Sequence, residues 1–97
     1  MSINIGRFLA SITLLPSDER GYSRRLIIRL KPNICAKSLA DWCINRGWAL
    51  ICYNHDPAEP LIILRAPDDR ANIVDELTTH IRQFIEERVL PQMQTLG

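Results

Sequence analysis

A chain of 97 residues, with 46% hydrophobic and 24% charged side chains, has the composition of a globular domain rather than of a disordered segment. We therefore expect a single domain over residues 1–97, with residues 91–97 as a frayed tail. No stretch approaches the ~20 apolar residues of a transmembrane helix, which argues against a membrane protein. The three cysteines form no closely spaced pair, which is typical of a reducing compartment and predicts a cytoplasmic protein.

The net charge of +1 conceals an uneven distribution along the chain. Residues 1–48 hold eight Lys or Arg against three acidic residues, whereas residues 49–97 hold four Arg against eight acidic residues. Such asymmetry governs partner choice and association rather than fold. The distribution therefore predicts a protein that acts by binding another molecule.

Two strands are predicted in the first third of the chain. Arg7–Leu15 is rich in apolar, β-compatible residues and ends at a proline. Arg24–Lys31 alternates between apolar residues and a mainly charged set, which is typical of a strand with one solvated face. The polar segment between them predicts a hairpin with a long loop.

A helix is predicted over Ile34–Arg46. Asn33 is a suitable N-cap and Gly47 stands where a C-terminal glycine belongs. Ser38 and Asp41 form a competing capping-box start, which leaves the first turn open. Four residues at helical spacing are expected to form its buried stripe: Cys35, Leu39, Trp42 and Cys43.

The second half repeats the order of strand, strand and helix. Trp48–Tyr53 and Leu61–Arg65 are the predicted strands, joined by a turn with two prolines. Asp68 or Asp69 is expected to cap a helix that runs to about Leu90, where the next proline stops it. Its apolar stripe contains Ile73, Val74, Leu77, Ile81, Phe84, Ile85 and Val89.

The element order β-β-α-β-β-α predicts an α+β protein. Two helices of this size cannot cover both faces of four strands, so we expect a two-layer sandwich with both helices on one face of a mainly antiparallel sheet. Circular permutation of the ferredoxin-like string β-α-β-β-α-β gives the same order, so a permuted ferredoxin-like arrangement is our expectation for the topology. The analogy concerns shape and carries no function.

The predicted strands are more apolar than a sheet with one wet face requires. Strand Arg7–Leu15 and the segment Leu61–Leu64 have apolar residues on both sides, and Leu50 and Cys52 oppose Ala49, Ile51 and Tyr53. Large exposed apolar patches are uncommon in monomers. We therefore expect a homodimer that packs through this face or through an edge strand, with coverage by the chain's own loops as the alternative.

Metal and cofactor sites are not expected. Cys35, Cys43, Cys52 and His55 are the only set that resembles metal ligands, and their spacing lacks the close pairs of structural zinc sites. No glycine-rich phosphate loop and no paired acid and base are found. We expect no catalytic residue, with one alternative: Cys35 in the first turn of its helix as the thiol of an enzyme or redox protein.

A basic group on the predicted hairpin is the best candidate for a binding site. We predict that it docks an acidic surface of another protein, which makes the chain a small non-enzymatic adaptor or regulatory protein that also self-associates. A nucleic-acid ligand is the alternative, weakened by a pI of about 7.8 and a single nearby aromatic ring. Solvation or internal pairing of the same charges is the simplest explanation. The group comprises Arg20, Tyr22, Arg24, Arg25, Arg29 and Lys31.

Overall fold

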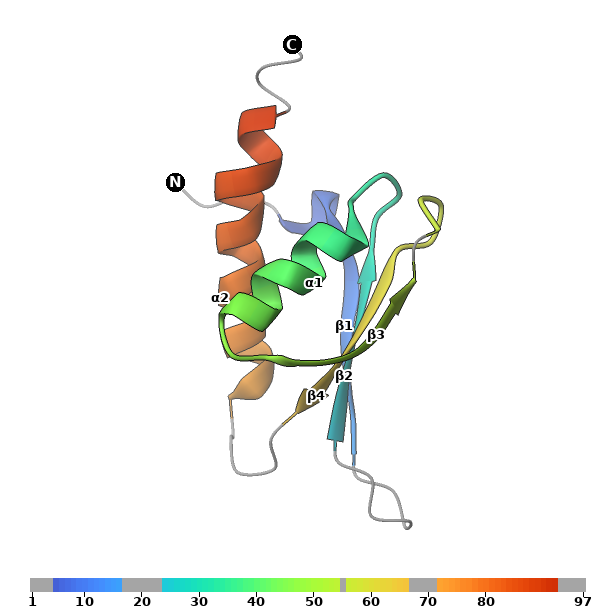
Figure 1. The fold of residues 1–97 in the computed structure, drawn as a ribbon, viewed down its shortest axis with the longest axis vertical. Helices are drawn as coiled ribbons and strands as arrows, with labels where there is room; N and C mark the ends of the chain where they lie inside the picture. Colours follow the sequence, from blue (N-terminus) through green and yellow to red (C-terminus); the bar gives the residue numbers. More distant parts are fainter. Residues whose placement is uncertain (1–4, 17–23, 55, 67–71, 93–97) are drawn as a thin grey trace.

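The computed structural model describes residues 5–16, 24–54, 56–66 and 72–92, and the structural statements below concern these ranges. They form one four-stranded sheet and two helices (Figure 1). The strands are β1 (Leu9–Leu15), β2 (Arg24–Leu30), β3 (Ala49–Asn54) and β4 (Leu61–Ala66). The helices are α1 (Ala36–Asn45) and α2 (Ile73–Phe84), with a 3-10 turn η1 (Ile5–Arg7) and a π-helical turn η2 (Ile85–Val89).

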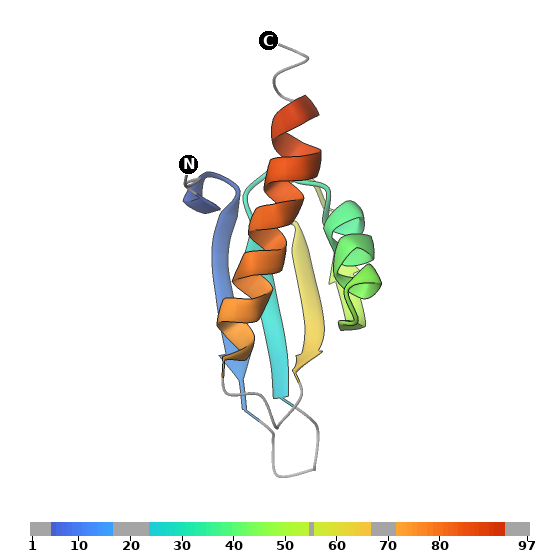
Figure 2. The same ribbon diagram turned by 90° about the vertical axis from the view of Figure 1, so that its left-hand side faces the viewer.

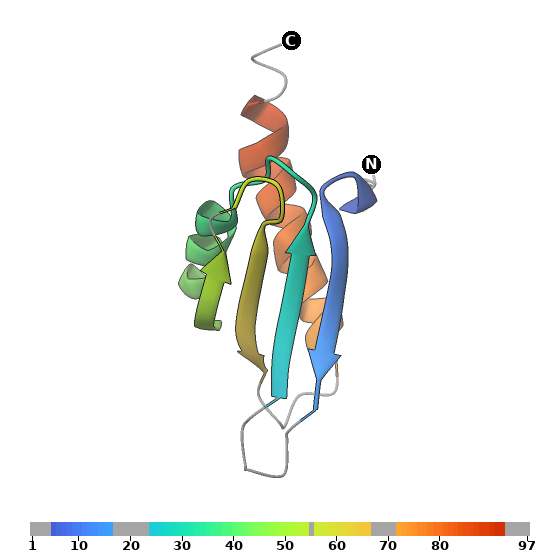
Figure 3. The same cartoon turned by 90° about the vertical axis from the view of Figure 1, so that its right-hand side faces the viewer.

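The sheet is antiparallel throughout, with the strand order β1-β2-β4-β3. Both helices lie on one face: α2 crosses in front of the strands in Figure 2, and the opposite face lies open toward the viewer in Figure 3. These features confirm the predicted α+β class. The order is the one obtained when the last strand of a ferredoxin-like sheet is moved to the front of the chain.

The hydrophobic core lies between the sheet and the helix layer. Alternation along the central strands places every second side chain of β2 and β4 against the helices, where nearly all are fully buried. The predicted stripe of α2 faces them, with Val74 and Val89 at its half-buried margins. The inward set comprises Leu26, Ile28, Leu30, Ile62, Leu64, Ala66, Ile73, Leu77, Ile81, Phe84 and Ile85.

A β-bulge interrupts each edge strand. In β1 the register shifts between Leu9 and Ser11, and in β3 between Leu50 and Cys52. An extra residue reverses the alternation beyond it, so Leu50 and Tyr53 face the core while Cys52 faces out. The predicted division of β3 into two faces was therefore wrong. In β1 the bulge places Leu9, which is paired with Leu30, against the core together with Ile12 and Leu14.

The start of α1 differs from the prediction. Cys35, not Asn33, is the N-cap, and its side chain makes no capping hydrogen bond. Asn33 adopts a left-handed φ of 73° in the preceding turn and donates its backbone N–H to the Pro57 carbonyl at 3.0 Å. Cys35 is exposed and lies outside the buried stripe in which it was expected. Asparagine tolerates this φ better than most residues do, which explains its place in the turn.

The end of α1 confirms the prediction for Gly47. This residue has a φ of 89° and donates its N–H to the Ile44 carbonyl, while Trp48 donates to the Cys43 carbonyl. The pair of bonds is the Schellman arrangement, which requires a left-handed residue at the glycine position. It turns the chain directly from α1 into β3.

Both ends of α2 differ from expectation. Asn72 is the N-cap, whereas the predicted caps Asp68 and Asp69 lie outside the described residues. Helical structure continues past Pro91 to residue 92 after the π-helical turn η2. A wider turn lengthens the hydrogen-bonded ring just before the proline, whose missing N–H normally ends a helix. The predicted tail begins within this helix, and its residues 93–97 lie outside the described ranges.

Two tryptophans tie α2 to the turn between α1 and β3. Trp42 donates its indole N–H to the His80 carbonyl at 2.9 Å, and Trp48 donates to His80 Nδ1 at 2.8 Å. Both indoles are 8% exposed, which confirms the buried position expected for Trp42 and places Trp48 in the core as well. His80 therefore joins the two helices with its backbone and its ring.

Removing this link is expected to destabilise the fold. His80→Ala leaves the Trp48 indole N–H without its acceptor, which costs about 1–3 kcal/mol of the free energy of unfolding. In urea titrations, Trp48→Phe combined with His80→Ala should cost less than the sum of the two single changes, because both remove one bond. Strictly additive losses would show that the bond contributes nothing.

Candidate functional site

The sheet face opposite the helices is the best candidate for a functional site (Figure 3). We call it the open face, and the strand pairing arranges its side chains in three rows across the four strands. The first row is Leu15, Arg25, Arg65 and Ala49. The second row is Thr13, Ile27, Ile63 and Cys52, and the third is Ser11, Arg29, Leu61 and Asn54.

The charges on the open face are all positive. Arg25 on β2 is paired directly with Arg65 on β4, and Arg29 lies two rows away on the same strand as Arg25. Among the described residues, none in the four strands is acidic. Like charges directly opposite each other in a sheet are destabilising. The strand register therefore places two like charges directly opposite each other on this face.

Arg25 has a second unfavourable feature. Its Nε atom is shielded from solvent and makes no hydrogen bond within the described ranges. A shielded donor without an acceptor costs stability, more so when it belongs to a charged group. Both features concern the same guanidinium, although the shielded Nε atom itself is closed to a carboxylate from outside.

An apolar centre separates the arginine rows. Ile27 and Ile63 face each other in the second row and are only partly buried. Leu15 and Leu61 are partly buried in the flanking rows, and Ile51 at the β3 bulge is 46% exposed. The expected surplus of apolar side chains on the second face is therefore present, although cations border it.

The predicted basic group is divided by the structure. Arg25 and Arg29 lie on the open face, and Lys31 is exposed directly after β2 on the same alternation. Arg24, expected at the start of this strand, is paired with Ala66 and belongs to the opposite, helix-facing alternation. Arg20 and Tyr22 lie outside the described residues.

Sequence reasoning missed Arg65 as a site residue. Arg65 ends a short apolar strand, and nothing local shows that it faces Arg25 across the sheet. The antiparallel pairing of β2 with β4 brings together residues 40 positions apart. The available signal was the alternation of Leu61, Ile63 and Arg65, which share one face of any strand through them.

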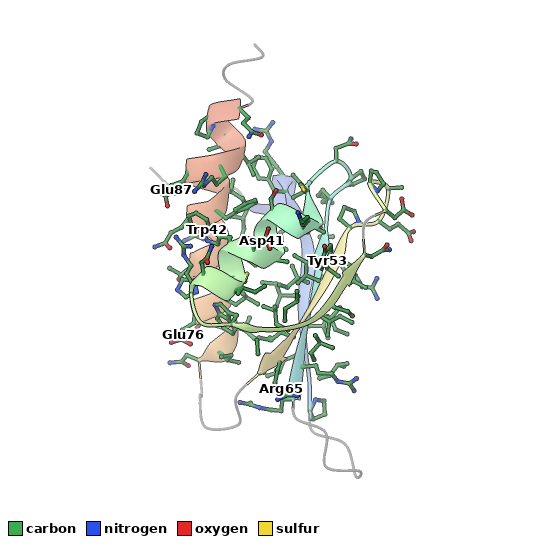
Figure 4. All side chains as sticks on the ribbon, in the orientation of Figure 1. Asp41, Trp42, Tyr53, Arg65, Glu76 and Glu87 are labelled. Atoms are coloured by element: carbon green, nitrogen blue, oxygen red, sulfur yellow. The ribbon has the colours of Figure 1, made fainter. Side chains whose placement is uncertain are left out.

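The acidic residues of the C-terminal helical segment lie on the other side of the molecule. Glu76 and Glu87 lie on the side of this segment that faces away from the strands, whereas Arg65 lies on the sheet near the end of β4 (Figure 4). The sheet therefore separates these two glutamates from the open-face arginines. The predicted acids Asp68 and Asp69 lie outside the described residues.

A second candidate site surrounds Cys35 at the start of α1. A groove of about 420 Å³ lies between α1 and the end of α2. The Ser38 hydroxyl donates to Cys35 Sγ at 3.2 Å, and this bond, helped by Lys37, lowers the pKa of the thiol below its usual range. No histidine lines the groove among the described residues, and Asp41 is the carboxylate that does.

The three thiols are expected to differ in reactivity. Cys35 is exposed and its pKa is lowered, whereas burial raises the pKa of Cys43 to about 11. Because the thiolate is the reactive form, iodoacetamide at pH 7 should label Cys35 fastest and leave Cys43 unlabelled in the folded protein. Peptide mass spectrometry over time measures both rates. Ser38→Ala should slow only Cys35, and an unchanged rate would contradict the assigned role of the hydroxyl.

No protein-family model, curated protein or solved structure matches this chain. The site must therefore be judged on its own geometry. Among the described residues, no group of three His, Cys, Asp or Glu side chains could hold a metal ion, and no helix there is long and apolar enough to cross a membrane. Of the two candidates, the open face combines more features that call for a ligand.

Proposed function

We propose that this protein is a small non-enzymatic adaptor that binds an acidic surface of another protein through its open face. The observation that carries the proposal is the direct pairing of Arg25 with Arg65 on a face without carboxylates among the described strands. Carboxylates of a partner relieve this repulsion and accept charge-assisted hydrogen bonds from the guanidinium groups. Arg29 extends the positive surface along β2.

The apolar centre favours a protein over a nucleic acid as the partner. Ile27 and Ile63 lie between the arginines and form an apolar surface. A charged phosphate backbone makes no apolar contact with such a surface, whereas a protein partner can cover it. Proteins that bind single-stranded nucleic acids also use aromatic side chains on which the bases stack. Within the described ranges, no aromatic side chain belongs to the open face. Arginine around an apolar core is typical of protein interfaces.

Charge also argues for a different protein rather than a second copy on this face. In a symmetrical dimer the same patch meets itself. Every charged strand residue described on the open face is an arginine, so two such faces would bring only cations together. The homodimer expected from the apolar surplus would therefore need another surface of the molecule.

The proposal is tested by charge reversal with a matched control. The variant Arg25→Glu/Arg29→Glu should lose the partners that the wild type retains from a cell extract, while Arg82→Glu should keep them. Arg82 is exposed on α2, on the far side of the sheet, and its reversal changes the charge in the same direction. Cross-links from retained partners should map to β2 and β4.

Two results would overturn the proposal. The first is equal loss of partners in both variants, which would show that net charge alone decides retention. The second is binding to a 20-nucleotide single-stranded DNA that weakens steeply with salt and depends on Arg25 and Arg29, because that behaviour is typical of phosphate contacts.

A further inference from the structure

We infer that the segment which the open face receives is an amphipathic acidic helix, lying diagonally across the strands. This inference rests on the proposed function and specifies the partner's structure. The strand register fixes how the three rows distribute apolar and charged side chains over the open face.

The apolar side chains form a diagonal stripe. Leu15 on β1 lies in the first row, Ile27 on β2 in the second and Leu61 on β4 in the third. Ile63 widens the stripe beside Ile27. With strands about 4.8 Å apart and rows about 7 Å apart, the stripe is about 17 Å long. That length corresponds to about eleven residues of α-helix.

The arginines lie on both sides of this stripe. Arg29 is on one side, and Arg25 and Arg65 are on the other. Four residues along β2 separate Arg29 from Arg25, which is about 14 Å along the strand. Because the stripe runs diagonally, the gap across it is about 8 Å between Arg29 and Arg25 and about 12 Å between Arg29 and Arg65. A helix with its side chains is about 10–12 Å wide, so it fits between Arg29 and Arg65 and lies over Arg25. Carboxylates on both flanks of its apolar stripe then reach arginines on both sides.

The alternative to a helix on the open face is a partner strand that is added at an edge of the sheet. The two edge strands are less suited to this kind of binding. Both edge strands contain a bulge, and a bulge disrupts the regular ladder that an added strand must continue. An extended peptide would also alternate its side chains between two faces, so only half of them would meet the stripe. A helix presents residues i, i+4 and i+7 along one line.

The chain's own helices do not meet this description. Among the described residues of α2, every exposed side chain is polar, so the helix offers no second apolar stripe to another copy. On α1 the only exposed large apolar residue is Ile44. The occupant must therefore come from a different protein with an apolar stripe bordered by Asp or Glu.

Two synthetic peptides of identical composition test the inference with the full chain. Both contain 15 residues of Leu, Glu, Ala and Gln; one places leucines at i, i+4 and i+7 with glutamates on both flanks, and the other alternates leucine and glutamate. Fluorescence anisotropy gives each affinity, and NMR shifts locate the contact. The helix-patterned peptide should bind more tightly and shift Leu15, Ile27 and Leu61.

Variants of the protein provide the control. Arg29→Glu and Arg65→Glu should each weaken binding of the helix-patterned peptide about tenfold or more, because each removes an attraction on one flank and adds a repulsion. Arg82→Glu should leave the affinity unchanged. Loss from only one of the two flanks would contradict a helix bordered on both sides.

The outcomes separate this inference from the proposed function. Tighter binding of the alternating peptide, or no binding of either while extract partners still depend on Arg25 and Arg29, overturns the helix and leaves the adaptor proposal intact. If extract partners are also indifferent to those arginines, both fail. Shifts confined to the groove beside Cys35 would overturn the inference as well.

Discussion

Replacing Arg65 with glutamate is expected to make the free protein more stable and to weaken its binding to an acidic partner at least tenfold. Arg65 is exposed and faces Arg25 directly across β2 and β4. Arg65→Glu converts a repulsive cross-strand pair into an attractive one, and pairs of this kind contribute about 0.2–1 kcal/mol. Stability and binding should therefore change in opposite directions.

Urea denaturation and peptide anisotropy on the same protein samples measure the two effects. Arg65→Gln should lie between the wild type and Arg65→Glu in both measurements, because it removes the repulsion without adding an attraction. Arg82→Glu should not combine a gain in stability with a loss of peptide affinity. If Arg65→Glu lowers stability, the repulsion inferred from the register is not present, and the main argument for a ligand at Arg25 is lost.

The largest loss of stability is expected from Leu64→Ala. Leu64 is fully buried at the centre of the sheet, paired with Leu26 on one side and Leu50 on the other. Truncation of such a leucine removes transfer energy and leaves a cavity, which together cost about 2–5 kcal/mol. In a small domain this is a large part of the 5–15 kcal/mol typical of folded proteins.

The matched control is Leu61→Ala on the same strand. Leu61 lies on the open face and is only partly buried, so its truncation should cost clearly less. The midpoint of urea denaturation should thus fall much further for Leu64→Ala. Equal losses would mean that the open face is covered in solution, by a second copy or by residues outside the described ranges.

Local patterns predicted those elements whose residues alternate or repeat without interruption. The alternation over Arg24–Leu30 and the helical stripe of α2 both reflect burial on one side, and both were confirmed. The bulges in β1 and β3 could not be predicted, because a bulge depends on the fit to the neighbouring strand. The predicted N-cap at Asn33 was wrong for a similar reason. Asn33 donates its backbone N–H to the carbonyl of Pro57, a contact with a distant segment that the local sequence does not show.

The candidate site was predicted in part. Arg25 and Arg29 follow from one strand's own alternation, which is a local property. Arg65 joins them only through the pairing of two strands separated by α1 and β3, and that register is set by the packing of the whole core. Arg24 was included in the basic group as the first residue of the strand, and the register places it on the helix-facing alternation.

The bulges in the two outermost strands also affect how the protein behaves at high concentration. A sheet with one bare face is at risk of growing sideways into fibres, because a regular free edge recruits further chains. Here the outer strands lose their regular ladder near Leu9 at one border and near Leu50 at the other. The bulges therefore interrupt both borders of the sheet as templates for polymerisation, although one of its faces is open.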